Sequence, residues 1–512
     1  MQEELISSRD MRVLEINAEY FGISLLQLME NAGRNIAEEV GSRFSKDRRI
    51  IIFCGLGGNG GDGFVAARHL LSLGFNNVAV VLVGKSENIS HSATLANWVA
   101  LQNFQENIPI WETTDVTDIP KTQVDIIVDA LLGTGTKGKL KSPISQFVDY
   151  INSVPATKIA VDVPTGVDSD SGEILGKTVK ADITVTFHKA KSGLGKAKDY
   201  VGELIVREIG LPHELETFAG PGDVMLVTKK RTLTSHKGDF GKALFIGGSE
   251  VFSGAPALMS MAALRTGIDI AYTASPEKTA HDIAAMSPDL ITIKLDGSPL
   301  NPKNLGILQN YVSSVDAVII GPGAGLHSET RSFVKSFVKM VEDAGKPILL
   351  DADGLKSFAE FRRKLKVPLV LTPHASEFTI LSGKTLPEDL RGRIQMVKQT
   401  AAELGAVILL KGKVDIISDG KKVKINFTGN PGMTVGGTGD VLSGIVGAFL
   451  SQKVDPFEAA VAGAFVNGAA GDLVAAELGF HMVATDLVNF VPQVLNDPIG
   501  SSKVRKASGK SS

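Results

Sequence analysis

The sequence predicts an α/β protein of two domains, each built on a largely parallel sheet that helices cover on both faces. A chain of 512 residues is too long for a single hydrophobic core. Short apolar runs, several rich in Val and Ile, alternate with helix-length segments, as in a covered parallel sheet. This rhythm weakens between Leu211 and Gly222 and then resumes. We therefore predict domains at 1–220 and 221–499, and a tail at 500–512 that we expect to be disordered.

The first domain opens with a helix and continues as a series of strands. Apolar residues recur at helical spacing from Leu25 to Val40, and Ser24 can cap the start of this helix. The apolar runs that follow predict strands at Ile50–Cys54, Val78–Val83, Ile126–Leu132, Ile159–Val163, Ile183–Phe187 and Leu204–Val206. The second domain has its own set, with strands predicted at Ala243–Ile246, Ile270–Thr273, Ala317–Ile320, Ile348–Leu350, Leu369–Leu371 and Val407–Leu410.

Composition and charge exclude several kinds of partner. The formal net charge is −3, so no global field draws the chain to nucleic acid or to anionic lipid, and neither is expected as a partner. The single cysteine, Cys54, lies in an apolar run, and we interpret it as a core residue of a reducing compartment. No apolar run reaches the roughly 18 residues of a membrane span, and no signal-peptide core is present. We expect a cytoplasmic protein and, on general grounds only, a homo-oligomer.

A glycine-rich loop at residues 55–63 is the first concentrated signal of function. It follows the strand Ile50–Cys54 and precedes a helix predicted at Phe64–Leu73, where glycines and free N–H groups favour binding of a phosphate. It is not the usual dinucleotide fingerprint, because Val78–Val83 runs into Gly84 and Lys85 with no acidic residue. The alternative is a plain glycine-rich turn in which Asn59 is a turn former.

Two acids mark further loops at predicted strand ends. Asp129 precedes a Gly/Thr-rich turn, and Asp162 precedes another. An acid at the end of an apolar strand is costly to bury unless a cation, a hydroxyl or a catalytic proton pairs with it. Alternatively, each acid caps the turn that follows it.

The second domain carries a sharper signal at residues 430–440. The segment Gly436–Gly439 supplies successive N–H groups at the start of an apolar helix, which favours binding of developing phosphoryl charge. Asp440 follows at once and can take the proton from an attacking hydroxyl. The alternative is that Asp440 is only the N-cap of the helix. The segment is not a Walker P-loop, since it contains no G-K-[S/T].

The three N-terminal loops resemble those of the NAD(P)H-hydrate epimerase family, from about Leu5 to Leu211. Gly58 stands where the family's loop, G-x-G-N-N-G-G-D-G, has its first Asn. The resemblance implies a Rossmann-like three-layer sandwich, Asp162 as acid/base, and K⁺ bound through oxygen by Asn59, Asp129 and Thr165. The segment at residues 188–194 resembles a later conserved segment of the same family, which favours Lys191 as a site residue; the alternative is a solvated surface lysine. The residues implied to bind the hydrated nucleotide are Gly58, Asn59, Gly60, Gly61, Asp62, Gly133, Thr134, Gly135, Thr136, Lys137, Gly138, Lys139 and Asp162.

The second domain resembles the ribokinase-like superfamily, and in particular the ATP/ADP-dependent NAD(P)H-hydrate dehydratase family, from about Thr232 to Val491. The motifs are Gly-Gly-Thr-Gly-Asp at 436–440, Gly-Pro-Gly-Ala-Gly at 321–325, Thr-Pro-His-Ala-Ser-Glu at 372–377 and Lys-Gly-Lys at 411–413. The resemblance implies Asp440 as catalytic base, with Mg²⁺ and ADP or ATP. Ala255, Gly323, Gly325, His374 and Asp440 would contact the hydrated nucleotide. Lys411, Gly412, Lys413, Val414, Asp415, Gly436, Gly437, Thr438 and Gly439 would hold the ADP or ATP.

Some roles stay open at this point. His374 is either a site residue or a core histidine, and we favour the site because Thr372 and Glu377 flank it. Asp351 and Asp353 are either turn residues or carboxylates associated with Mg²⁺.

Together the two resemblances predict repair of hydrated NADH and NADPH. The first domain would interconvert the R and S epimers, and the second would dehydrate the S form at the expense of ADP or ATP through a phosphorylated intermediate. The alternatives are a vitamin-type small-molecule kinase, a non-catalytic N-terminal domain and, least favoured, a Rossmann oxidoreductase.

Overall fold

The computed structural model describes residues 5–119 and 123–501, and the chain divides into two compact units, Met1–Leu215 and Glu216–Ser512. The predicted tail lies largely outside the described residues. The prediction that disorder begins at residue 500 is corrected, because Gly500 and Ser501 belong to a short helix, α18 (Pro498–Ser501).

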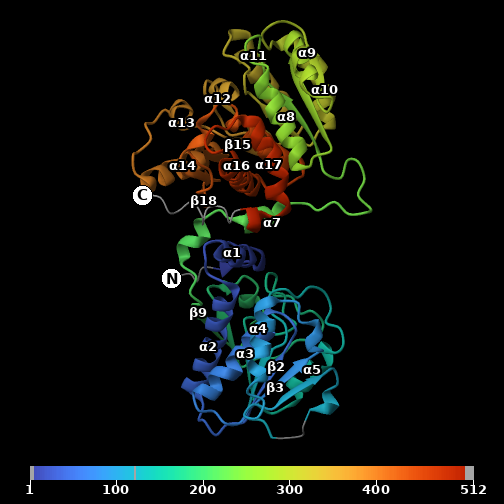
Figure 1. Cartoon of the computed structure of the whole chain (residues 1–512), viewed down its shortest axis with the longest axis vertical. Helices are drawn as coiled ribbons and strands as arrows, with labels where there is room; N and C mark the ends of the chain where they lie inside the picture. Colours follow the sequence, from blue (N-terminus) through green and yellow to red (C-terminus); the bar gives the residue numbers. More distant parts are fainter. Residues whose placement is uncertain (1–4, 120–122, 502–512) are drawn as a thin grey trace. The chain divides into compact units, whose positions relative to one another are not determined.

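The N-terminal unit is a three-layer sandwich around a sheet of seven parallel strands in the order β4-β3-β2-β5-β6-β7-β9. Its helices α2, α3 and α4 lie on one side of β2 and β3, and α5 lies on the other (Figure 1). A separate two-stranded pairing joins β1 to β8. The elements are β1 (Leu5–Ile6), α1 (Ser8–Tyr20), α2 (Leu25–Arg43), β2 (Ile50–Cys54), α3 (Gly58–Ser72), β3 (Val78–Val83), α4 (Ser92–Gln102), β4 (Ile110–Thr113), β5 (Ile126–Ala130), α5 (Ile144–Ser153), β6 (Thr157–Val161), β7 (Ile183–Phe187), β8 (Ala190–Lys191), α6 (Lys198–Val201) and β9 (Glu203–Arg207).

The C-terminal unit contains a sheet of nine strands in the order β12-β11-β10-β13-β14-β15-β16-β17-β18. The strands from β12 to β16 are parallel, whereas β17 and β18 add an antiparallel edge. The strands are β10 (Lys242–Ile246), β11 (Ile270–Pro276), β12 (Ile291–Leu295), β13 (Ala317–Ile320), β14 (Ile348–Leu350), β15 (Leu369–Leu371), β16 (Val407–Leu410), β17 (Asp415–Ser418) and β18 (Val423–Asn426).

Helices cover both faces of this second sheet. Side chains of α10, α11, α12, α13 and α14 form one large apolar core with β10, β13, β14 and β15, and α8, α15 and α16 pack together elsewhere in the unit. The helices are α7 (Pro221–Val227), α8 (Gly254–Thr266), α9 (Glu277–Met286), α10 (Leu305–Ser314), α11 (Ser328–Asp343), α12 (Ala352–Ala359), α13 (Ala375–Ser382), α14 (Leu390–Leu404), α15 (Thr438–Ser451), α16 (Pro456–Leu478) and α17 (Ala484–Asn496).

One helix corrects the expectation about membrane-length segments. Among the described residues, α16 is long and apolar enough to span a membrane by length and composition. However, 83% of its apolar window is buried inside the protein. It is therefore a core helix of the C-terminal unit, and its small residues allow α15 and α7 to pack closely against it.

Candidate active sites

Three loops meet at the carboxyl edge of the N-terminal sheet. Because β2, β5 and β6 are parallel neighbours, the loops that leave their carboxyl ends lie at one edge. These loops contain residues 55–63, 129–138 and 162–168, which are the segments that the sequence indicated. The fold thus gathers the predicted N-terminal residues in one place.

The glycine loop forms the start of α3 rather than a separate turn. Residues 58–62 occupy the first turns of this helix, after Gly57 as N-cap residue. A Cβ on Gly60 would lie 1.9 Å from the carbonyl oxygen of Gly55, so only glycine fits there. The prediction that the helix begins at Phe64 is wrong, because close packing outweighs the low helix propensity of glycine. The first N–H groups of α3 have no partner within the helix and can bind an anion.

Oxygen atoms gather beside the start of α3. Asp129 is fully buried, and its two carboxylate oxygens accept hydrogen bonds from the hydroxyl and the N–H of Thr165 at 2.7 and 2.8 Å. The side-chain oxygen of Asn59 lies against Gly133, and the buried Asn59 Nδ2 has no hydrogen-bond partner among the described residues. No Lys or Arg of the described residues forms an ion pair with Asp129, and burial raises the pKa of its carboxyl to about 6. Such a buried carboxylate among oxygen donors fits a hard cation.

The loop at residues 133–139 is more open. The N–H of Thr136 donates to the carbonyl of Gly133 at 3.4 Å, and Gly138 has a positive φ of 74°. The side chains of Lys137 and Lys139 are exposed and can attract phosphate groups to this edge.

Asp162 is the centre of a polar cluster. It follows β6 with a left-handed φ of 64°, which is rare for a residue other than glycine and frequent at functional sites. Its Oδ1 lies 2.6 Å from Nζ of Lys191 and accepts a hydrogen bond from the hydroxyl of Thr186 at 3.0 Å. Lys191 is 1% exposed, so the interpretation as a solvated surface lysine is wrong.

Two further carboxyls interact with this pair. Burial, aided by the charges of Asp162 and Glu15, raises the pKa of Asp62 well above its usual value, and Lys191 opposes this shift. Burial and the charge of Asp162 likewise raise the pKa of Glu15, in α1, to about 7, against Lys191 and Arg12. Glu15 could not be recognised from the sequence, because it lies in an ordinary helix outside every motif.

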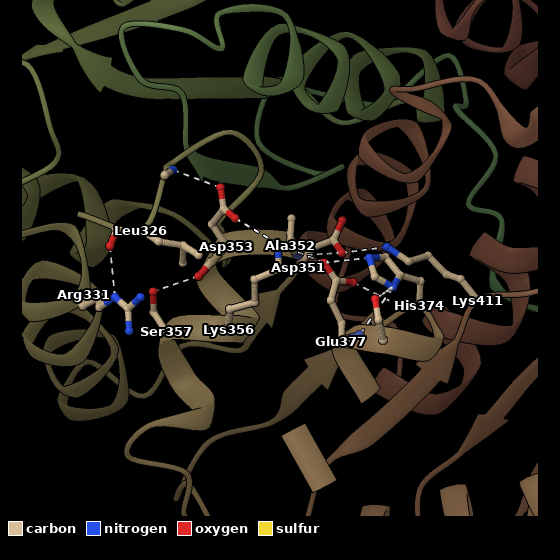
Figure 2. Close-up of polar contacts among 12 residues, drawn as sticks. Leu326, Arg331, Asp351, Ala352, Asp353, Lys356, Ser357, His374, Glu377 and Lys411 are labelled. Carbon is tan, nitrogen blue, oxygen red and sulfur yellow. Dashed lines mark hydrogen bonds and ion pairs between the residues drawn. The ribbon is translucent and has the colours of Figure 1, made fainter. Parts of the chain in front are cut away.

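The C-terminal site is built in the same way. The strands from β13 to β16 are consecutive parallel neighbours, so their carboxyl ends bring together residues 321–325, Asp351, residues 372–377 and residues 411–415. Figure 2 shows Asp351, His374, Glu377 and Lys411 grouped at this edge.

Helix α15 begins within the Gly-Gly-Thr-Gly segment. Gly437, with a φ of 96°, is the N-cap residue, and Asp440 lies in the first turn. The alternative that Asp440 is the N-cap is therefore wrong. The hydroxyl of Thr438 donates to the carbonyl of Met433 at 2.9 Å, which leaves the first N–H groups of the helix free for an anion.

The pKa of Asp440 suits a general base that works near neutral pH. Burial raises the pKa of Asp440 to about 7, the charge of Asp351 adds to this rise, and Lys411 opposes it. Nζ of Lys411 lies 2.8 Å from Asp351, and a Cβ on Gly439 would lie 3.4 Å from the same Nζ. The ammonium therefore lies against the start of α15, beside the predicted anion site.

The remaining residues of the 411–415 segment form the turn between β16 and β17. The Asp415 carboxylate accepts hydrogen bonds from the N–H of Gly412 and from Nδ2 of Asn426, both at 3.0 Å, and burial raises its pKa to about 6. The side chain of Lys413 is exposed and that of Val414 is half-buried. Asp415 thus closes the turn, while Lys411 points to the site.

The predicted substrate contacts lie along the same edge. Gly323 has a φ of 70°, and a Cβ on it would lie 3.4 Å from the Cβ of Ala255. The N–H of Gly325 donates to Asp353 at 3.0 Å. His374 is half-exposed and caps α13, where its Nδ1 accepts from the N–H of Glu377 at 3.4 Å, so it is not a core histidine.

The two acids whose roles were open both contact protein donors. Asp351 accepts from Lys411 and the N–H of Ala352 through one oxygen and from the hydroxyl of Ser443 through the other, at 2.7–2.9 Å. Asp353 accepts from Gly325 and Lys356 (Figure 2). These contacts favour the interpretation as turn and positioning residues.

Each of the two units matches a known protein family. The family described as YjeF-related protein N-terminus matches residues 25–193, and the NAD(P)H-hydrate dehydratase family matches residues 243–493. A bifunctional NAD(P)H-hydrate repair enzyme of Pyrobaculum aerophilum is 45% identical over 500 residues, which cover 96% of this chain and 98% of that one. The chain belongs to the family of bifunctional NAD(P)H-hydrate repair enzymes.

Other members of this repair family are similar over the same extent. The relative from Archaeoglobus fulgidus is 44% identical over 498 residues, covering 96% of this chain and 98% of that one. Among solved structures, the ADP/ATP-dependent NAD(P)H-hydrate dehydratase of Bacillus subtilis, co-crystallised with ATP and Mg²⁺, is 28% identical, covers 55% of this chain and 97% of that one, and has a TM-score of 0.47. Membership of the repair family confirms the two resemblances seen in the sequence.

Proposed function

We propose a division of labour between the two units of this NAD(P)H-hydrate repair enzyme. The N-terminal unit interconverts the R and S epimers of the hydrate, and the C-terminal unit dehydrates the S form with ADP or ATP. The observation that carries the proposal is Asp440, whose pKa is raised to about 7, in the first turn of a helix that begins Gly-Gly-Thr-Gly beside Lys411.

Asp440 would act as general base in the dehydratase. It takes the proton from the hydroxyl at C6 of the hydrate, and that oxygen attacks the terminal phosphoryl group of the nucleotide, so that AMP leaves from ADP or ADP from ATP. Phosphate is a better leaving group than hydroxide, because its second pKa is about 6. The ring nitrogen then expels phosphate from C6, and loss of a proton from C5 restores the double bond of NADH or NADPH.

The nucleotide would lie at the start of α15. The free N–H groups after Gly436 and the ammonium of Lys411 are suited to the charge that develops on the transferred phosphoryl group. The Bacillus subtilis relative was crystallised with ATP and Mg²⁺. We infer that Mg²⁺ accompanies the nucleotide here and neutralises its phosphates.

The epimerase unit would hold K⁺ through Asn59, Asp129 and Thr165. A buried carboxylate without a pairing Lys or Arg among the described residues supports a cation at this position. The ion supplies a fixed positive charge for the negatively charged substrate. Asp162 lies at the same edge and would exchange protons at the reacting carbon.

Replacement of Asp129 by Asn should remove the response of the N-terminal unit to K⁺. The two tryptophans of the chain, Trp98 and Trp111, both belong to this unit, so their fluorescence reports its unfolding. At about 100 times its Kd, bound K⁺ would stabilise the wild-type unit by about 2.7 kcal/mol relative to Na⁺ at equal ionic strength. Asp149→Asn, at an exposed position of α5, should keep this gain. If K⁺ still stabilised the N-terminal unit of Asp129→Asn relative to Na⁺, Asp129 would be excluded as a ligand.

The function is tested by absorbance at 340 nm with both epimers of NADH hydrate, Mg²⁺, K⁺ and either ADP or ATP. Complete recovery of NADH, faster than uncatalysed epimerisation allows, would support both activities and identify the phosphoryl donor. If recovery of NADH stops at the fraction of the hydrate that is one epimer, only the dehydratase activity would be supported. A stable phosphorylated product without NADH would instead indicate a small-molecule kinase.

Two further expectations accompany this function. The buried, unpaired Cys54 and the metabolic substrate fit a cytoplasmic enzyme, and we propose that location. A homo-oligomer is proposed on general grounds, and light scattering of the purified chain would test it.

A further inference from the structure

The Asp162–Lys191 pair is assembled by segments far apart in the sequence. Lys191 lies in β8, which pairs in parallel with β1, and Ile6 is the partner of Lys191 in this pairing. The N–H and the hydroxyl of Ser192 both lie 3.2 Å from the carbonyl oxygen of Ile6 and donate to it. Two residues further on, Ser8 donates hydrogen bonds to the carboxylate of Asp170 from its N–H and its hydroxyl. The N-terminal arm, defined as Leu5–Tyr20, is thus fastened directly beside Lys191.

The buried ammonium of Lys191 has a full set of acceptors. Besides the ion pair with Asp162, its Nζ donates to the hydroxyl of Thr186 at 3.1 Å and to the carbonyl of Phe187 at 3.0 Å. An ammonium carries three donors, and here three oxygens receive them. Burying such a charge is costly unless it is paired and hydrogen-bonded, so this complete set fixes the position of Nζ.

The pair is arranged with the carboxylate on the open side. Asp162 is 14% exposed, whereas Lys191 is 1% exposed, so the ammonium lies behind the carboxylate. The ammonium can therefore orient the carboxylate of Asp162 without touching a ligand. Glu15 and Arg12 from α1 and Asp62 from α3 are the other charged groups that interact with this cluster.

We propose that Lys191 is a positioning residue of the epimerase centre, and that the N-terminal arm completes this centre by holding Lys191 in place. The proposal rests on the epimerase function and extends it to a segment that the family match, which begins at residue 25, leaves out.

Lys191→Met in the full-length chain tests the first half of the proposal. Conversion of one purified epimer to the other, without nucleotide, should lose about 100-fold in kcat with KM changed by less than about threefold. Lys191→Arg keeps the charge but not the three-acceptor geometry, and it should recover at least about a tenth of the lost rate. Lys198→Met, at an exposed position of the same segment, should behave as the wild type.

Tryptophan emission separates this effect from unfolding, because both tryptophans lie in the N-terminal unit. A Lys191→Met enzyme with native emission and wild-type epimerisation would overturn the proposal. If Lys191→Met does not fold, Lys191→Arg decides: a kcat below the wild-type value with KM changed by less than about threefold is expected, and a wild-type kcat overturns the proposal. Absence of epimerisation in the wild type would instead refute the proposed function.

Asp170→Ala tests the second half, because it removes the acceptor of both hydrogen bonds that Ser8 donates from the arm. A loosened arm should no longer hold Lys191 in place, so kcat for epimerisation should fall by at least about tenfold with KM changed by less than about threefold. Asp199→Ala, at an exposed position of α6, should behave as the wild type. A wild-type kcat in Asp170→Ala with native tryptophan emission would exclude the arm from the centre.

Discussion

Asp440→Asn should remove the dehydratase activity and leave the epimerase activity of the same molecule intact. Asn keeps the shape of Asp440 but cannot accept the proton of the C6 hydroxyl, and loss of a general base lowers a rate by about 10²- to 10⁴-fold. The wild-type rate should rise with pH through about 7, since the pKa of Asp440 is raised to that value by burial and by Asp351 and only the ionised form acts as base. Nucleotide-dependent recovery of absorbance at 340 nm measures both effects.

The epimerase activity provides the internal standard for this experiment, because it depends on the other unit. Asp282→Asn, an exposed position in α9 of the same unit, should leave both activities unchanged. If Asp440→Asn kept more than about a tenth of the wild-type rate, Asp440 would not be the base.

The strands of both sheets could be read from the sequence where the whole run is buried. Ile50–Cys54, Ala317–Ile320 and Ile348–Leu350 begin and end as the apolar pattern predicts, since a strand covered on both faces must be apolar throughout. The half-exposed strands β4 and β12 were missed, because their apolar runs are broken by polar residues. The hairpin of β17 and β18 was also missed, although Asp419-Gly420 between its strands is a turn signal.

The residues of the candidate sites also differ in how well the sequence predicts them. The glycine loops and the acids at strand ends carry a local signal, because backbone approach to an anion requires glycine in a fixed place. Glu15 carries no comparable signal, and Lys191 was indicated only weakly, through the segment at residues 188–194. Their environment arises from the pairing of β1 with β8 and the packing of α1, and only tertiary structure brings residues so distant in sequence together.

Asp351→Asn should destabilise the C-terminal unit and displace the pH dependence of dehydration. Asp351 is almost fully buried and binds both Lys411 and Ser443, and loss of one member of a buried ion pair costs about 3–5 kcal/mol. The free energy of unfolding of this unit, from denaturant titration followed by circular dichroism, should fall accordingly. The tryptophan signal of the N-terminal unit should not change.

The sign of the pH effect follows from the neighbours of Asp440. The negative charge of Asp351 helps burial to raise the pKa of Asp440, whereas Lys411 lowers it. Without the charge of Asp351, the positive charge of Lys411 is compensated less and lowers the pKa of Asp440 more. Both changes therefore lower the pKa of Asp440. The acid limb of the pH–rate profile should therefore move below its wild-type position near pH 7.

Asp316→Asn is the matched control, because Asp316 precedes β13 at the opposite edge of the same sheet and accepts a hydrogen bond from the N–H of Lys242. It can lower stability without moving the acid limb. An acid limb that stays in place in Asp351→Asn would mean that Asp351 only supports the fold. An acid limb that moves to lower pH in Asp351→Asn alone would show that Asp351 sets the working pH of the base through Lys411 and its own charge.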